Sequence, residues 1–248
     1  MLRVARRSYV VASAAVFAVV YAVLGLFPVS AYIGVSSFLT FREVVSPLAG
    51  MIFGPLVGGF SMVIGNFVDF AFGKPVVFDF LDFVPDLASA VLAGLVFTGR
   101  RKVAFAFPVV LLIWYALDPL SVNFVQVGGA SVPFYWLHAV SIVVLGAALV
   151  LESRKRIGRL HPAFIAATVF ASTMAGHLAG SILYENILVR INGVLTPSVL
   201  AGNWNLIFYA YPAERILFTV LGTAISVPVL RSLARRKNNS ATAMATRA

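Results

Sequence analysis

Turn-forming residues divide this chain into apolar runs about as long as a bilayer is thick. A transmembrane helix needs about 20 mostly apolar residues, and the runs at residues 9–27, 55–72, 133–151 and 163–183 come close to that length. Hydrophobic residues make up 60% of the chain and charged residues only 11%, whereas soluble domains carry roughly 25% charged residues. The sequence therefore predicts an all-α polytopic membrane protein.

The positions of helix-breaking residues and the lengths of the apolar runs predict about eight transmembrane helices in a single domain, residues 1–236. The expected helices cover residues 9–27, 43–53, 55–72, 80–97, 103–117, 133–151, 163–183 and 204–230. The first run follows basic residues, as in a signal peptide, but signal cores span only about 7–15 residues. We therefore interpret it as a retained helix. The polar tail, residues 237–248, is expected to be disordered and cytoplasmic.

A Gly-Pro pair, Gly54-Pro55, interrupts the stretch GMIFGPLVGGFSMVIGNFVDF. One helix over residues 43–72 would be about 45 Å long, well over the ~30 Å hydrocarbon core. It would also hold Pro55 in its interior, where proline removes a hydrogen bond. We therefore predict two helices joined by a tight turn at Gly54. Gly58 and Gly59 are expected to let neighbouring helices approach closely.

Basic residues gather in four clusters, which orient the predicted helices. These clusters lie at residues 3–7, 100–102, 154–159 and 231–237, and the net charge is +10. Because Lys and Arg concentrate on the cytoplasmic side, both termini are predicted to be cytoplasmic in a multi-pass protein of the cell membrane. Nucleic-acid binding is not expected, because the basic residues are scattered over short loops without interleaved aromatic residues.

Several polar residues fall within or near the outer halves of the predicted helices. Charges at membrane depth are costly, so they face the bundle interior and mark candidate sites. Spacings of three, four and seven residues place such side chains on one helix face. If these faces converge, they line one outward-facing cavity. The candidate substrate contacts are Asp86, His177, Tyr184, Asn205, Tyr209 and Arg215.

The residues alone leave alternatives open for these side chains. Arg215, beside Glu214, could form a buried ion pair that locks two helices, or could bind an anionic ligand. His177 could bond a neighbouring helix or a ligand. Trp136, Trp204, Tyr209 and Tyr211 could form cavity walls or an interfacial aromatic belt.

Enzyme signatures are missing from the sequence. The chain has no cysteine, no Walker A sequence, no nucleophile constellation and no HExxH-type metal motif. We therefore expect no enzymatic activity, no cofactor and no metal site. Uphill transport would then need a partner that hydrolyses ATP, or an ion gradient.

Small residues recur at four-residue spacing in the first predicted helix, at Ala14, Ala18 and Ala22. From spacing alone, internal helix packing is the favoured interpretation. This ladder, the run PLAGMIFGPLVGGFSMVIGNFVDF, the helix FLDFVPDLASAVLAGLVF and the closing helix PAERILFTVLGTAISVPVLRSL together resemble the S components of energy-coupling factor transporters. S components are the membrane subunits that bind vitamins and related micronutrients.

The resemblance implies a fold, partners and a mechanism. S components usually have six helices, so residues 103–117 and 133–151 would form an additional hairpin. In that family the alanine ladder contacts a transmembrane coupling protein attached to a pair of ATPases, which implies Ala14, Ala18 and Ala22 as the partner contact. The ligand lies in an outward-facing cavity. The expected mechanism is ligand capture from outside, followed by reorientation of the subunit against its partner.

Two other functions compete with micronutrient capture. A gradient-driven carrier would use Asp69, Asp86 or Glu214 as its proton or ion site. A membrane enzyme acting on lipid or isoprenoid substrates would use Asp82 and Asp86 with a divalent cation. The ligand is not specified by the sequence: aromatic walls suit a flat heterocycle, and Arg215 suits a carboxylate or phosphate. Flavin, thiamine, biotin and purine-like compounds all remain open.

Overall fold

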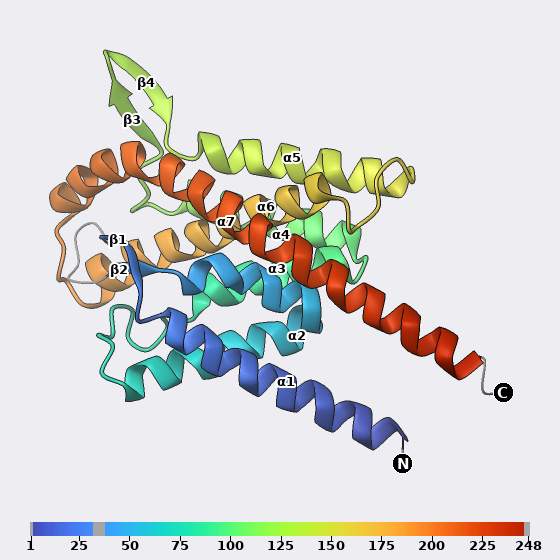
Figure 1. The fold of residues 1–248 in the computed structure, drawn as a ribbon. Coiled ribbons are helices and arrows are strands. Elements are labelled where there is room, and N and C mark those ends of the chain that lie inside the picture. Colours follow the sequence, from blue (N-terminus) through green and yellow to red (C-terminus); the bar gives the residue numbers. More distant parts are fainter. Residues whose placement is uncertain (1, 32–37, 246–248) are drawn as a thin grey trace.

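The computed structural model describes residues 2–31 and 38–245, which form a bundle of helices with two short β-hairpins (Figure 1). Within these residues, four helical stretches are long and apolar enough to cross a bilayer: Arg42–Ala71, Trp136–Ser153, Pro162–Ile191 and Pro197–Arg236. Val10–Leu24 and Val84–Phe97 are shorter apolar helices. The predicted class of α-helical membrane protein is confirmed. The number of crossings and the side on which the termini lie stay predictions.

The elements follow one another along the chain in this order. They are α1 (Leu2–Leu24), β1 (Pro28–Ala31), β2 (Phe38–Thr40), α2 (Arg42–Ala71), α3 (Val84–Phe97), α4 (Arg101–Leu117), β3 (Phe124–Val127), β4 (Ala130–Pro133), α5 (Trp136–Ser153), α6 (Pro162–Glu185), the π-helical segment η1 (Asn186–Ile191) and α7 (Pro197–Ala245). Each predicted helix overlaps one of these. The ranges on either side of Gly54 both fall in α2.

α2 is broken at Gly54, whose backbone is not helical (φ 81°, ψ 176°). A side chain at Gly58 would meet the carbonyl oxygen of Ala49 at 2.7 Å. In a straight helix residues nine apart are about 13 Å apart along the axis, so the two halves of α2 fold back on each other. The tight turn predicted at Gly54 is therefore present, and only glycine adopts this backbone conformation at low cost.

α3 packs against the α2 hairpin at backbone distance. A Cβ at Gly50 would lie 1.9 Å from the carbonyl oxygen of Ala90, and one at Gly94 would lie 2.4 Å from the nitrogen of Pro55. Glycines at these positions let the helix backbones touch. This contact fixes the start of α2 beside the start of α3, which is where the candidate site lies.

The alanine ladder of α1 is used for packing within the chain. Ala14, Ala18 and Ala22 are only 9%, 1% and 5% exposed, and a Cβ at Gly65 of α2 would lie 2.8 Å from the carbonyl oxygen of Ala18. The ladder is covered by α2, because its small side chains match glycine there. The partner contact that the resemblance implies for these alanines stays a prediction. The opposite face of α1 is exposed, with Val16 at 65%.

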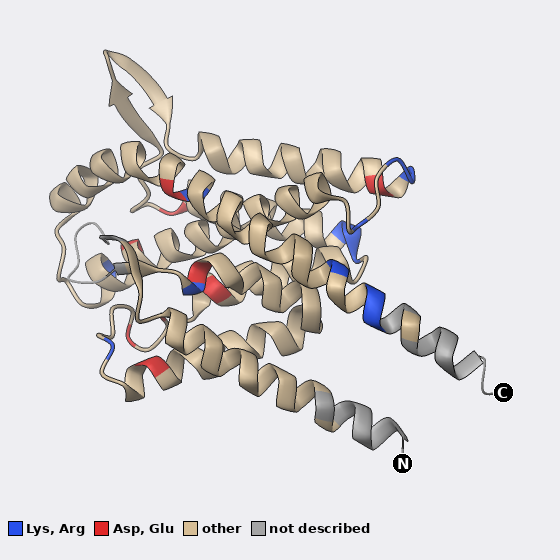
Figure 2. Ribbon diagram, viewed as in Figure 1, with Lys and Arg blue, Asp and Glu red and all other residues tan. Residues whose placement is uncertain are grey.

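The ends of the bundle differ in character. Figure 1 shows both β-hairpins at the left of the view, and the start of α1 and the end of α7 at the right. Basic side chains gather near the right-hand end (Figure 2), where Glu152 of α5 pairs with Arg101 at 2.5 Å and with Arg159 at 2.9 Å.

α7 continues to Ala245, through most of the segment for which composition predicts a disordered tail. No glycine or proline follows Pro228 to stop the helix. Residues 246–248, part of that predicted tail, lie outside the described residues.

Candidate functional site

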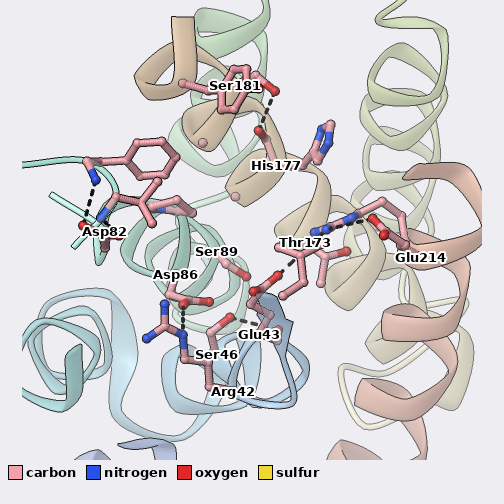
Figure 3. Close-up of a pocket in the computed structure, with 18 of the residues that line it drawn as sticks. Arg42, Glu43, Ser46, Asp82, Asp86, Ser89, Thr173, His177, Ser181 and Glu214 are labelled. Atoms are coloured by element: carbon pink, nitrogen blue, oxygen red, sulfur yellow. Dashed lines mark hydrogen bonds and ion pairs between the residues drawn. The ribbon is translucent and has the colours of Figure 1, made fainter. Parts of the chain in front are cut away.

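A cavity of about 100 Å³ lies between α2, α3, α6 and α7 (Figure 3). At 10–15 Å³ for each water molecule, it has room for a small polar molecule. Its walls come from the starts of α2 and α3, the loop between them, the second half of α6 and the first half of α7. Among the described residues, seven charged ones line it: Arg42, Glu43, Lys74, Asp82, Asp86, Glu214 and Arg215.

Arg42 is the centre of the first charged cluster, on the α2–α3 side. Its guanidinium lies 2.5 Å from Asp69 and 3.5 Å from Asp86. The hydroxyl of Tyr21, on α1, donates a hydrogen bond to Asp86, and Lys74 Nζ lies 3.7 Å from Asp69. Two cations and two carboxylates thus balance one another in this buried cluster, as burial of charge requires.

Arg215 is the centre of the second charged cluster, on the α2–α7 side. One of its terminal nitrogens lies 3.8 Å from Glu43 and 3.8 Å from Glu214. The guanidinium also lies 4.7 Å from the ring of Phe218, close enough for a cation–π contact. Arg215 therefore joins α7 to α2, which is the helix-locking role left open by the sequence, and it does so at the cavity wall.

His177 reaches the cavity from α6 and is held by a partner that sequence spacing did not reveal. His138 of α5 lies 3.0 Å away, between its Nε2 and Nδ1 of His177. Tyr211 stacks on His177 at 5.1 Å between ring centroids, and its hydroxyl donates a hydrogen bond to the carbonyl oxygen of Phe134. Residues of three helices thus fix the orientation of the His177 imidazole at the cavity wall.

The structure brings together four of the six candidate contacts. Asp86, His177, Tyr184 and Arg215 line the same cavity. Asn205 and Tyr209 do not: the Asn205 amide donates to the carbonyl oxygen of Ala201, and Tyr209 is 63% exposed.

The helical repeat of α7 explains why these two residues lie outside the cavity. Its cavity-facing residues include Trp204, Ile207 and Glu214, which follow spacings of three and seven. Asn205 follows Trp204 directly and is therefore rotated by about 100° from it around the helix axis. Tyr209, four residues after Asn205, lies on the same face as Asn205.

Arg42, Lys74 and Ser89 are site residues that sequence reasoning missed. Arg42 and Glu43 lie next to each other at the start of a long apolar run. Charged residues in a membrane helix are candidate site residues, and that position could have identified Arg42. Ser89 follows Asp86 at three residues, on the same helix face, and that spacing could have identified it.

No family model, curated protein or solved structure matches this chain. The resemblance to S components therefore rests on the sequence motifs alone. Within the described part of the chain, no group of three or more His, Asp or Glu side chains converges in a way that could hold a metal ion.

Lys74 lies in the connection after α2, outside the membrane-spanning segments. Burial, together with the charge of Arg42, lowers the pKa of Lys74 to about 8 from 10.5, against the opposing effect of Asp69. Between these two values the unfolded chain holds a proton that the folded chain has released, so the free energy of unfolding rises with pH.

We expect the melting temperature of the purified protein to rise between about pH 8 and pH 10 for this reason. Thermal unfolding in detergent, followed by circular dichroism across this range, measures the effect. Lys74→Met should flatten the rise, because methionine keeps the apolar stem and has no proton to release. Equal slopes in the parent protein and the variant would contradict the assignment to Lys74.

Proposed function

We propose that this protein is a membrane-embedded capture subunit for a small micronutrient, a vitamin or related heterocycle. The observation that carries the proposal is the cavity between α2, α3, α6 and α7, which combines buried charges with the rings of His177, Tyr184 and Trp204. Ligand sites are concave, with apolar walls and a few precisely placed polar groups. This cavity has both.

The orientation of the chain follows from its charges. The cavity lies toward the starts of α2 and α3, whereas the basic connections lie at the end of α3 and at the start of α6. With basic connections cytoplasmic, the cavity opens toward the outside of the cell. We infer eight crossings, with the α2 hairpin contributing two, so that both termini lie inside.

We further propose that a separate coupling protein and a pair of ATPases drive uptake, as the resemblance to S components implies. The burial of Ala14, Ala18 and Ala22 under α2 leaves the exposed valine face of α1 as the accessible apolar surface on that helix. Reorientation of the subunit against its partner would then carry the ligand across.

The test is to purify the protein in mild detergent, denature it, and identify any released small molecule by mass spectrometry. A stoichiometric vitamin-like compound is expected. Asp86→Asn should reduce its retention, while Tyr209→Phe, outside the cavity, should retain it. A folded protein that releases nothing and is not stabilised by any member of a vitamin panel would refute capture.

A gradient-driven carrier is the second candidate, favoured by the burial of Asp69 and Asp86 inside the helical bundle. Buried intramembrane carboxylates are typical of proton and ion pathways. Uptake into proteoliposomes containing only this protein, driven by a proton or sodium gradient, would support the carrier. Uptake that requires added ATPase partners would support the capture subunit.

A further inference from the structure

The basic residues of two connections meet at one end of the bundle, the right-hand end in Figure 2. Three lie at the turn from α3 to α4, and four lie in the connection from α5 to α6. We call these seven residues the basic patch: Arg100, Arg101, Lys102, Arg154, Lys155, Arg156 and Arg159. The stretches that carry them, residues 97–107 and 147–162, contain one acidic residue, Glu152.

Arg159 joins the two connections into one surface. Its Nη1 donates a hydrogen bond of 2.8 Å to the carbonyl oxygen of Phe97, at the end of α3, and its Nε lies 2.9 Å from Glu152 of α5. Glu152 in turn lies 2.5 Å from Arg101, at the start of α4. Because these contacts tie the ends of three helices together, the basic patch is a defined surface built from residues far apart in the chain.

Positive charge exceeds negative charge in the basic patch. Seven basic side chains and the carboxylate of Glu152 leave an excess of six positive charges. That carboxylate is shared by Arg101 and Arg159. Among the described residues, no carboxylate forms an ion pair with the five other basic side chains, all of them exposed, which are Arg100, Lys102, Arg154, Lys155 and Arg156. An anion bound among them would be attracted by several cations at once.

Exposed apolar side chains lie next to these charges. The turn between α3 and α4 has an open hollow of about 440 Å³, lined by residues 99–103. Val103 of α4 is 55% exposed and Leu151 of α5 is 38% exposed. α4 and α5 lie side by side, since a Cβ at Gly146 would be 3.0 Å from the ring of Phe105. An anion in the basic patch would therefore have apolar surface within one helical turn of it.

The basic patch lies at the depth of lipid headgroups. α5, which is long and apolar enough to cross a bilayer, ends at Ser153, and the next such stretch begins at Pro162. The connection between them carries four of the seven basic residues. Basic residues beside the ends of transmembrane helices attract anionic lipids, and basic pockets between such helices bind lipid headgroups.

We propose that the basic patch binds the headgroup of an anionic phospholipid. The phosphate would lie among the exposed cations of the two connections, and the acyl chains would lie against the exposed apolar side chains of α4 and α5. A free phosphate or an acidic protein would meet the charges alone, whereas a phospholipid also covers Val103 and Leu151. The inference adds a second binding site to the protein and does not depend on the ligand of the cavity.

The experiment compares lipids that differ in headgroup charge. Dioleoylphosphatidylglycerol and dioleoylphosphatidylcholine have the same acyl chains, and glycerol phosphate carries the anionic group without them. Each is titrated onto the delipidated full chain in neutral detergent, and the dissociation constant is measured by native mass spectrometry. Phosphatidylglycerol should bind about tenfold or more tightly than either of the other two. It should also raise the melting temperature, because it binds the folded protein.

Matched variants locate the lipid. The double variant Arg100→Gln/Lys102→Gln should weaken phosphatidylglycerol binding about 25-fold, and Arg156→Gln about fivefold, because each basic residue near a membrane surface contributes about fivefold in affinity. Arg231→Gln/Arg235→Gln removes two exposed cations of α7, outside the basic patch, and should change the affinity less than about threefold. All variants should bind phosphatidylcholine as the parent does and show its circular dichroism spectrum.

Four outcomes would overturn the proposal. Equal binding of the two lipids would refute selection by charge. Equal binding of glycerol phosphate and phosphatidylglycerol would assign the basic patch to a free phosphate. Tighter binding of an octaglutamate peptide than of phosphatidylglycerol would assign it to an acidic partner protein. Equal losses in the two double variants would mean that the lipid responds to the total charge of this end of the bundle, without a site at the basic patch.

Discussion

An Arg42→Met variant should have a free energy of unfolding about 3–5 kcal/mol lower than that of the parent protein. Arg42 is 6% exposed and its guanidinium contacts both Asp69 and Asp86. Methionine fills much of the same volume, but it leaves Lys74 as the only cation that the described residues pair with these two buried carboxylates. Uncompensated buried charge is one of the few mechanisms that produce a loss of this size.

The measurement is chemical unfolding in mixed micelles, followed by circular dichroism. Arg101→Gln is the control, because Arg101 forms an exposed pair with Glu152 and surface pairs contribute about 0–1 kcal/mol. Adding Asp69→Asn to Arg42→Met should recover part of the loss, because it removes one of the stranded charges. Similar losses for Arg42→Met and Arg101→Gln would show that the Arg42 cluster is not a buried one.

The helical class and the break in α2 could be predicted from sequence because both depend on local signals. The length of the apolar runs indicates transmembrane helices. Glycine is common just after the end of a helix and proline at the first position of the next, so Gly54-Pro55 indicates a break between two helices. The β3–β4 hairpin also had a local signal. Gly128 and Gly129 separate two short apolar strands and have φ of 56° and 86°, a pattern typical of a two-residue hairpin turn.

The candidate site was only partly predictable, because its contacts join residues far apart in the chain. Arg42 meets Asp69 only because the α2 hairpin returns past its own start. His138 meets His177 only because α5 lies beside α6. Spacing along one helix predicts which residues share a face of that helix. It does not predict which other helix or partner packs against that face. The alanine ladder illustrates this limit, because the same stripe suits a partner protein and α2 equally well.

Gly50→Ala should strongly destabilise this protein. The new Cβ would lie 1.9 Å from the carbonyl oxygen of Ala90, 2.8 Å from its carbonyl carbon and 2.9 Å from the nitrogen of Gly94. All three are backbone atoms, so no side chain can rotate away, and α2 and α3 must separate. Overpacking usually costs about 1–3 kcal/mol and more where backbone has to move, so we expect a loss of about 3 kcal/mol or more.

Gly202→Ala is the matched control, because a Cβ at Gly202 would have no atom within 4 Å. Alanine is the better helix former by about 1 kcal/mol, so this variant should be as stable as the parent or slightly more stable. Gly50→Ala should also weaken ligand binding, since Arg42 and Glu43 lie on α2 and Asp86 and Ser89 on α3. A Gly50→Ala protein with the parent's unfolding midpoint and ligand affinity would mean that these two helices do not touch through their backbones, and that the cavity walls do not depend on this contact.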